Sequence, residues 1–172
     1  MQPQEIIQAT HSATSEVFST MMGLEIEPGN THTDPAAPSV NDGVMAFVGI
    51  AGPWVGTGII SCSAECACYL CETFLMTEAK DVNEEVLDAV GEIANMVIGN
   101  FKTAAEAVVG ALGLTVPTVI YGKNFTSRNL GNNDWIVMPF NIGKHVLEVR
   151  ILFAPAPESH ATRTTGTYVH TF

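Results

Sequence analysis

Two polar side chains three residues apart, Glu92 and Asn95, are the strongest candidates for chemistry in this sequence. They lie within residues 83–112, where apolar residues recur every three or four positions and predict one long amphipathic helix. On a helix, this spacing places the carboxylate and the carboxamide about one turn apart on the same side. A rigid helix can insert two such groups into the shallow site of a partner molecule. We therefore take Glu92 and Asn95 as candidate functional residues.

The polar side of this predicted helix continues in both directions. Its members are Glu85, Asp88, Glu92, Asn95, Gly99, Lys102 and Glu106. An ordinary solvent-exposed face explains such a line on most helices. Gly99 weakens that interpretation, because glycine costs about 1 kcal/mol relative to alanine within a helix and is more natural where another backbone must come close. We expect Glu85, Asp88, Gly99 and Lys102 to contact a binding partner.

The other side of the predicted helix is apolar and is expected to be buried. Its members are Val86, Leu87, Val90, Ile93, Ala94, Val97, Ile98, Phe101, Ala105, Val108 and Val109.

A cluster of four cysteines is the second group that could carry chemistry. Cys62, Cys66, Cys68 and Cys71 lie within ten residues and offer soft ligands for zinc or an iron–sulfur cluster. On a helix, however, Cys68 lies about 100° or more around the axis from Cys66, so four thiolates do not easily converge on one ion. Because cysteine is among the most buried residue types, we expect structural thiols and no bound metal. A metal or redox sensor built on the cysteines is a weaker alternative.

Composition and charge exclude several classes of function. The 172 residues carry a net charge of −11 and only seven Lys and Arg. A nucleic-acid-binding protein or an electrostatic membrane anchor needs clustered cations, and none are present. The sequence shows neither an export signal nor an apolar run long enough to span a bilayer. We therefore expect a cytoplasmic protein with reduced thiols that binds neither nucleic acid nor membranes.

The elements that must position these residues follow an α+β order. Helices are predicted at residues 5–21, 64–76 and 83–112, with Gly23 ending the first, Ser63 capping the second and Asp81 or Asn83 opening the third. Strands are predicted at 24–27, 44–50, 55–61, 118–122, 135–140 and 145–153, and a loop at 28–42. This order predicts a single, mainly antiparallel sheet of five to six strands with three helices packed on it. Residues 1–153 are expected to form one domain, and residues 154–172 a C-terminal tail.

The segment GEIANMVIG (91–99) resembles the phosphatase motif of the CheC/CheX family of chemotaxis proteins, in which Glu and Asn stand three residues apart on a long helix. The similarity continues in GIAGPWVGTGIIS (49–61) and in VPTVIYG (116–122), and it covers about residues 5–153. Only one copy of the motif is visible. The earlier candidates fail because Glu16 is followed three residues later by Ser19, and Glu72 by Leu75. A single copy resembles CheX more than CheC.

This resemblance implies a protein phosphatase that dephosphorylates a phospho-aspartyl, CheY-like response regulator. In such an enzyme the Asn95 side chain positions the attacking water, which suits a carboxamide because it has both an acceptor and donors. Glu92 engages the active-site lysine of the regulator. No cofactor on this chain is implied, because the Mg²⁺ lies in the regulator's own active site.

The resemblance also implies a homodimer formed through the sheet, and the apolar strands 135–140 and 145–153 fit either a dimer seam or the core. A non-catalytic CheX-like binding module in two-component or chemotaxis signalling is the alternative to an enzyme.

Overall fold

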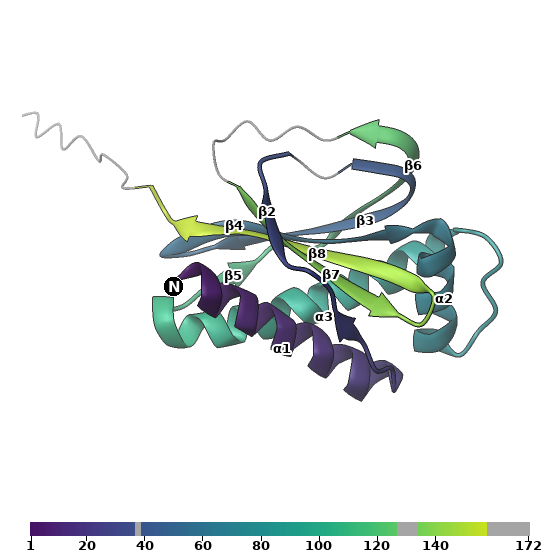
Figure 1. Ribbon diagram of the computed structural model, residues 1–172, viewed down its shortest axis with the longest axis horizontal. Helices are drawn as coiled ribbons and strands as arrows, with labels where there is room; N and C mark the ends of the chain where they lie inside the picture. Colours follow the sequence, from purple (N-terminus) through teal and green to yellow (C-terminus); the bar gives the residue numbers. More distant parts are fainter. Residues whose placement is uncertain (37–38, 127–133, 158–172) are drawn as a thin grey trace, which may run out of the picture.

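The computed structural model describes residues 1–36, 39–126 and 134–157. Its three helices all lie on one face of one large sheet (Figure 1). The helices are α1 (Pro3–Met22), α2 (Ala64–Leu75) and α3 (Glu84–Val109). The strands are β1 (Glu27–Pro28), β2 (His32–Asp34), β3 (Ser39–Ala51), β4 (Trp54–Ser63), β5 (Gly113–Leu114), β6 (Thr118–Thr126), β7 (Trp135–Ile142) and β8 (His145–Pro155).

Every strand pairing in the described residues is antiparallel. The strand order is β1-β7-β8-β4-β3-β5, with β2 also paired to β7 and β6 also paired to β3. The predicted α+β architecture is confirmed, but the described residues form eight strands, where five to six were predicted. The strand predicted at 24–27 is observed only as the two-residue β1, and the two additional strands, β2 and β5, contain three and two residues. Alternation of polar and apolar residues cannot be recognised over so short a run.

The predicted start and stop signals of the helices are confirmed. The Ser63 hydroxyl accepts a hydrogen bond from the Cys66 backbone N–H at 3.2 Å, and the Asn83 side chain accepts one from Val86 at 3.0 Å. These side chains satisfy donors that the first turn of a helix leaves free. Gly23 ends α1 with φ 62°, a left-handed conformation that suits glycine.

Two expectations, one for residues 28–42 and one for Val108, are wrong in detail. The segment 28–42 is not one loop, because it contains β2 and the first residues of β3. Val108, expected on the buried side of α3, is 58% exposed and lines a shallow hollow between α1 and α3. Helical periodicity identifies a side of the helix but does not show where its neighbours end.

Helix α3 occupies the central position in the helical layer. It packs against α1, α2, β3, β4 and β6. Its buried side joins the main core between the helices and the sheet, and the largest fully buried side chains there include Phe18, Phe101 and Phe140. A helix held by so many neighbours is a rigid support for the side chains on its outer side.

Strand β8 runs slightly past residue 153, where the end of the domain was predicted. Strand β8 continues to Pro155, and Val55 of β4 pairs with Ala154. The next backbone N–H, that of Ala156, donates to the Pro53 carbonyl at 2.9 Å. We propose that the domain ends after residue 156. The rest of the predicted tail, from residue 158, lies outside the described residues.

Candidate active site

Glu92 and Asn95 lie one turn apart near the middle of α3. Glu92 is exposed and Asn95 is half-buried, whereas Ile93, Ala94 and Val97 are fully buried in the core. Three residues advance a helix by about 4.5 Å and separate the two side chains by about 60° around its axis. The carboxylate and the carboxamide therefore share one accessible side of the helix.

Within the described residues, the polar contacts of α3 do not involve the side chains of Glu92 and Asn95. The helix cap at Asn83, the Thr103 hydroxyl bonded to the Gly99 carbonyl, and the Asn100 amide bonded to Glu16 all involve other residues. Among the residues that the structure describes, Glu92 and Asn95 have no hydrogen-bond or ion-pair partner. Both side chains are available to a partner molecule.

The other predicted contact residues lie on the same side of α3, with different exposure. Glu85 and Asp88 are exposed, and Gly99 and Lys102 are half-buried. Lys102 Nζ lies 2.9 Å from Glu106 Oε1, which also accepts a hydrogen bond from the Leu112 backbone N–H at 2.8 Å. The N–H of Leu112 and the ammonium of Lys102 hold the pKa of Glu106 below its usual value. Lys102 thus stabilises the C-terminal end of α3 through its ion pair with Glu106.

The two glycines next to the motif have different structural environments. A Cβ atom added to Gly91 would lie 3.0 Å from Val119 Cγ2 of β6, so close packing accounts for glycine at that position. A Cβ atom added to Gly99 would meet nothing within 4 Å. No contact within the described chain requires glycine at residue 99. A close approach by a partner molecule would explain why this position has no side chain.

Asp88 and Glu92 form a ridge between two shallow hollows. A hollow of about 520 Å³ lies on one side, where α3 meets the connection from β5 to β6, and its other lining residues are Leu87, Gly91, Val116, Pro117 and Val119. A hollow of about 680 Å³ lies on the other side, where α3 meets the end of α2, and its other lining residues are Phe74, Leu75, Glu84, Glu85 and Ala89. We call these the β6-side hollow and the α2-side hollow. Asn95 lines neither of them.

The charge around the ridge is entirely negative. Four carboxylates, those of Glu84, Glu85, Asp88 and Glu92, line the two hollows, and no Lys, Arg or His among the described residues does. A surface of this kind attracts a cationic partner and repels an acidic one.

Sequence reasoning missed the apolar residues of the two hollows. Leu75 and Val116 belong to segments far apart in the chain, and tertiary packing brings both to the same ridge. The similarity that includes residues 116–122 was the only signal for Val116.

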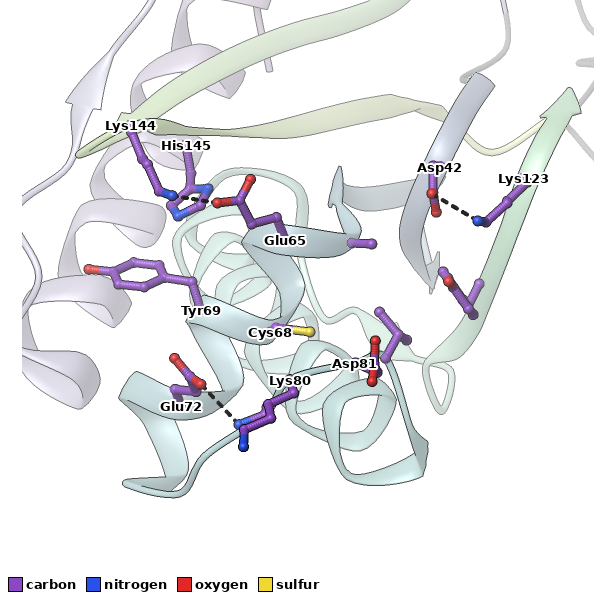
Figure 2. Close-up of a pocket in the computed structure, with 14 residues that line it drawn as sticks. Asp42, Glu65, Cys68, Tyr69, Glu72, Lys80, Asp81, Lys123, Lys144 and His145 are labelled. Carbon is purple, nitrogen blue, oxygen red and sulfur yellow. Dashed lines mark hydrogen bonds and ion pairs between the residues drawn. The ribbon is translucent and has the colours of Figure 1, made fainter.

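A third hollow, of about 540 Å³, lies apart from the ridge, between α2, β3, β6 and the turn from β7 to β8 (Figure 2). Each of its three lysines has an acidic partner: Lys123 lies 3.4 Å from Asp42, Lys80 lies 3.8 Å from Glu78, and Lys144 pairs with Glu65. Tyr69 stacks on His145 with ring centroids 4.9 Å apart. The ion pairs and the stacked rings give this hollow a structural explanation, and neither Glu92 nor Asn95 lines it.

The four cysteines are buried, as expected, with exposed fractions of 0–9%. A hydrogen bond with Cys66 is the main cause that raises the pKa of the Cys62 thiol, and the same bond lowers the pKa of Cys66. Burial raises the pKa of Cys68 and of Cys71. In the part of the chain that the structure describes, no group of three or more His, Cys, Asp or Glu could hold a metal ion. No helix there has both the length and the apolar character needed to cross a bilayer.

Comparison with known proteins decides the family. The family model described as chemotaxis phosphatase CheX matches residues 44–141, more than half of the chain. The chain belongs to the CheX family. The match includes α2, α3 and the connection to β6, and therefore every residue of the ridge and of its two hollows. Membership in the CheX family confirms the predicted relationship and the predicted class of enzyme, a phosphatase.

Individual CheX proteins are similar to this chain in sequence and in structure. The CheY-P phosphatase CheX of Thermotoga maritima is 25% identical over 127 residues, which cover 73% of this chain and 81% of that protein. The CheX structure from Desulfovibrio desulfuricans has a TM-score of 0.78 and 27% identity, covering 87% of this chain and 99% of that one. A CheX–CheY–BeF₃–Mg²⁺ complex from Borrelia burgdorferi contains a chain with a TM-score of 0.75 and 28% identity, covering 86% of this chain and 97% of that one.

Proposed function

We propose that this chain dephosphorylates a CheY-type response regulator that carries phosphate on an aspartate. The observation that carries the proposal is the position of Glu92 and Asn95, one turn apart on the accessible side of α3 within the region that matches the CheX family. The similarity to a CheY-P phosphatase from Thermotoga maritima and to a chain found in a complex with CheY supports the choice of substrate.

In this proposal Asn95 positions the water that attacks the phosphorus atom. Its carboxamide oxygen accepts a hydrogen bond from the water and its N–H₂ group donates one, so the lone pair of the water can be aimed in line with the departing carboxylate. A P–O bond forms to the water, the P–O bond to the aspartyl carboxylate breaks, and inorganic phosphate leaves. No covalent intermediate on this chain is needed.

Glu92 has the separate role of engaging the regulator. Its carboxylate is exposed and has no partner within the described part of the chain, so it can form an ion pair with the active-site lysine of the regulator, and this pair would fix how the two proteins meet. The acidic ridge around Glu92 favours such a cationic site.

We place the Mg²⁺ needed for phosphoryl transfer in the regulator and assign no cofactor to this chain. Mg²⁺ and a phosphoryl mimic, BeF₃, accompany CheX and CheY in the complex from Borrelia burgdorferi. A cytoplasmic location follows from the proposed substrate, because a phospho-aspartyl regulator acts inside the cell.

We also propose that the chain forms a homodimer, but through strand β6 and not through residues 135–140 and 145–153. Strands β7 and β8 each pair on both sides within the sheet, so residues 135–140 and 145–153 belong to its interior. In the described residues β6 pairs only with β3, and Ile120 and Tyr121 on β6 are 39% and 41% exposed. A second copy can therefore add along β6. A strict monomer in sedimentation at micromolar concentration would contradict the dimer.

Phosphate release tests the proposed activity. A CheY-type regulator from the same organism is charged with acetyl phosphate and Mg²⁺, and the release of phosphate is followed with and without this chain. We expect catalytic amounts of the chain to accelerate the release. Binding to the charged regulator without acceleration would instead support the non-catalytic binding module.

A further inference from the structure

Two apolar groups project on either side of the acidic ridge of α3. Val116, which lines the β6-side hollow, is 84% exposed. Leu75, which lines the α2-side hollow, is 41% exposed, and the adjacent Met76 is 93% exposed. Single exposed apolar residues are common on protein surfaces. Val116 and Leu75 differ because they line the hollows on either side of the ridge that carries Glu92, and Met76 directly follows Leu75 in the chain.

The backbone around Val116 is fixed at both neighbouring residues. The Thr115 N–H donates to the Gly49 carbonyl at 3.0 Å, and the Gly49 N–H donates to the Thr115 hydroxyl at 2.9 Å. On the other side, the ring of Pro117 restricts the backbone. Val116 is therefore held outward by ordered chain, and its contact with a partner would cost little conformational entropy.

The backbone at the end of α2 is also fixed, and it is strained. Met76 has φ 56° and ψ 40°, and among the described residues it is the only one other than glycine with a positive φ. At the end of a helix, this left-handed conformation is usually adopted by Gly or Asn, because a larger side chain makes it unfavourable. The Glu72 carboxylate accepts a hydrogen bond from the Ala79 N–H at 3.0 Å and closes the turn. Packing in the described fold does not account for methionine here, because the side chain is 93% exposed.

Charge complementarity identifies the kind of surface that fits between the two apolar groups. Glu84, Glu85, Asp88 and Glu92 form an acidic centre, and no cation lies among the lining residues that the structure describes. A matching partner has a cationic centre with apolar residues on both sides of it. In the proposed function, the active-site lysine of the regulator is the cation that meets this acidic centre, and a complex of CheX with CheY, BeF₃ and Mg²⁺ from Borrelia burgdorferi supports the regulator as the occupant.

We propose that Val116 on one side, and Leu75 and Met76 on the other, are the apolar contacts through which this chain recognises the phosphorylated regulator. The proposal rests on the proposed function, because it takes the regulator as the occupant of the ridge. Glu92 supplies the charged contact at the centre, and the apolar groups add affinity and select among regulators that share the same catalytic centre. These residues position the substrate and do not touch the reacting atoms.

Binding to a trapped regulator tests the contacts without depending on catalysis. The full chain is titrated with a CheY-type regulator of the same organism, saturated with beryllofluoride and Mg²⁺. The variants are Val116→Asp, Val116→Ala, Leu75→Asp and Met76→Asp. The matched control is Val146→Asp, because Val146 is 54% exposed on β8 and lines neither hollow. Circular dichroism and thermal melting establish that each variant folds.

We expect each aspartate variant to weaken binding about tenfold or more, the scale of one lost apolar contact. Val116→Ala should weaken binding by less, and Val146→Asp should leave it unchanged. In phosphate release, the same variants should raise KM for the phosphorylated regulator and leave kcat near the wild-type value.

The inference and the proposed function can fail separately. Wild-type affinity in all the Val116, Leu75 and Met76 variants would overturn the inference, even if the chain proves to be a phosphatase. If the variants bind the trapped regulator more weakly than the wild-type chain does, but the wild-type chain releases no phosphate, the inference would be supported and the enzyme contradicted. No binding of any trapped regulator to the wild-type chain would overturn both.

Discussion

Gly58 of β4 lies directly against Ile98 of α3, three residues beyond Asn95. A Cβ atom added at residue 58 would come within 2.7 Å of Ile98 Cγ1. The absence of a side chain on the strand therefore lets the motif helix approach the sheet closely. This contact helps to set the height of α3, and with it the position of Glu92 and Asn95 above the core.

Replacing Gly58 with alanine should destabilise the fold. The added methyl group forces Ile98 or the helix to move, and overpacking of this kind costs about 1–3 kcal/mol. Chemical denaturation followed by circular dichroism measures the loss. In the double variant Gly58→Ala/Ile98→Val, the smaller side chain should recover part of it, so that the two changes are not additive. Additive effects would show that the contact between residues 58 and 98 does not set the packing.

Gly99→Ala should have the opposite effect on stability. Nothing lies within 4 Å of a Cβ atom at this position, and alanine is favoured over glycine within a helix by about 1 kcal/mol. We expect a more stable protein that binds the trapped regulator less well, because the methyl group meets the backbone of the partner. Gly91→Ala is the comparison and should lower stability through its contact with Val119. Unchanged binding by Gly99→Ala would remove residue 99 from the interface.

Glu92→Lys should weaken binding of the trapped regulator by about tenfold or more, because it replaces the proposed ion pair with a repulsion between two cations. Glu27→Lys is the matched control, since Glu27 is exposed on β1 and gives the same change in net charge. Calorimetric titration at two salt concentrations provides the measurement. Equal losses for the two variants would indicate a general charge effect and refute the specific role of Glu92.

The buried cysteines should react slowly with a thiol reagent in the folded protein. Burial raises the pKa of Cys68 and Cys71, which lowers the fraction of reactive thiolate at neutral pH, so the rate should rise as the pH increases. All four free thiols should titrate at once after denaturation. Elemental analysis should find no stoichiometric zinc, and its presence would revive the metal-sensor alternative.

The sequence predicted those features that local chemistry determines. Ser63 and Asn83 cap their helices as expected, because a hydroxyl or amide oxygen at a helix start meets the free backbone N–H groups wherever the helix lies. Glu92 and Asn95 share one side of α3 because three residues nearly complete a turn. The helix itself was recognisable because its apolar positions repeat over many turns.

The features that sequence reasoning missed depend on packing between distant segments. Val108 has the periodicity of a core residue but is exposed, since burial depends on which neighbours reach the last turn of α3. Strand β5 is too short to show a pattern. Leu75 and Val116 meet the same ridge only after the chain has folded, so their shared location could not be read from either segment alone.

The decay of a phosphorylated CheY-type regulator in the presence of Asn95→Ala tests the central claim most directly. Decay constants are measured with Mg²⁺ for the regulator alone, with the wild-type chain and with the variant. Because Asn95 is half-buried and has no intramolecular partner in the described residues, the variant should fold and should still bind the beryllofluoride-trapped regulator. We predict that it loses about a hundredfold or more of the acceleration, because the attacking water is no longer held in place. Decay as fast as with the wild-type chain would contradict the account.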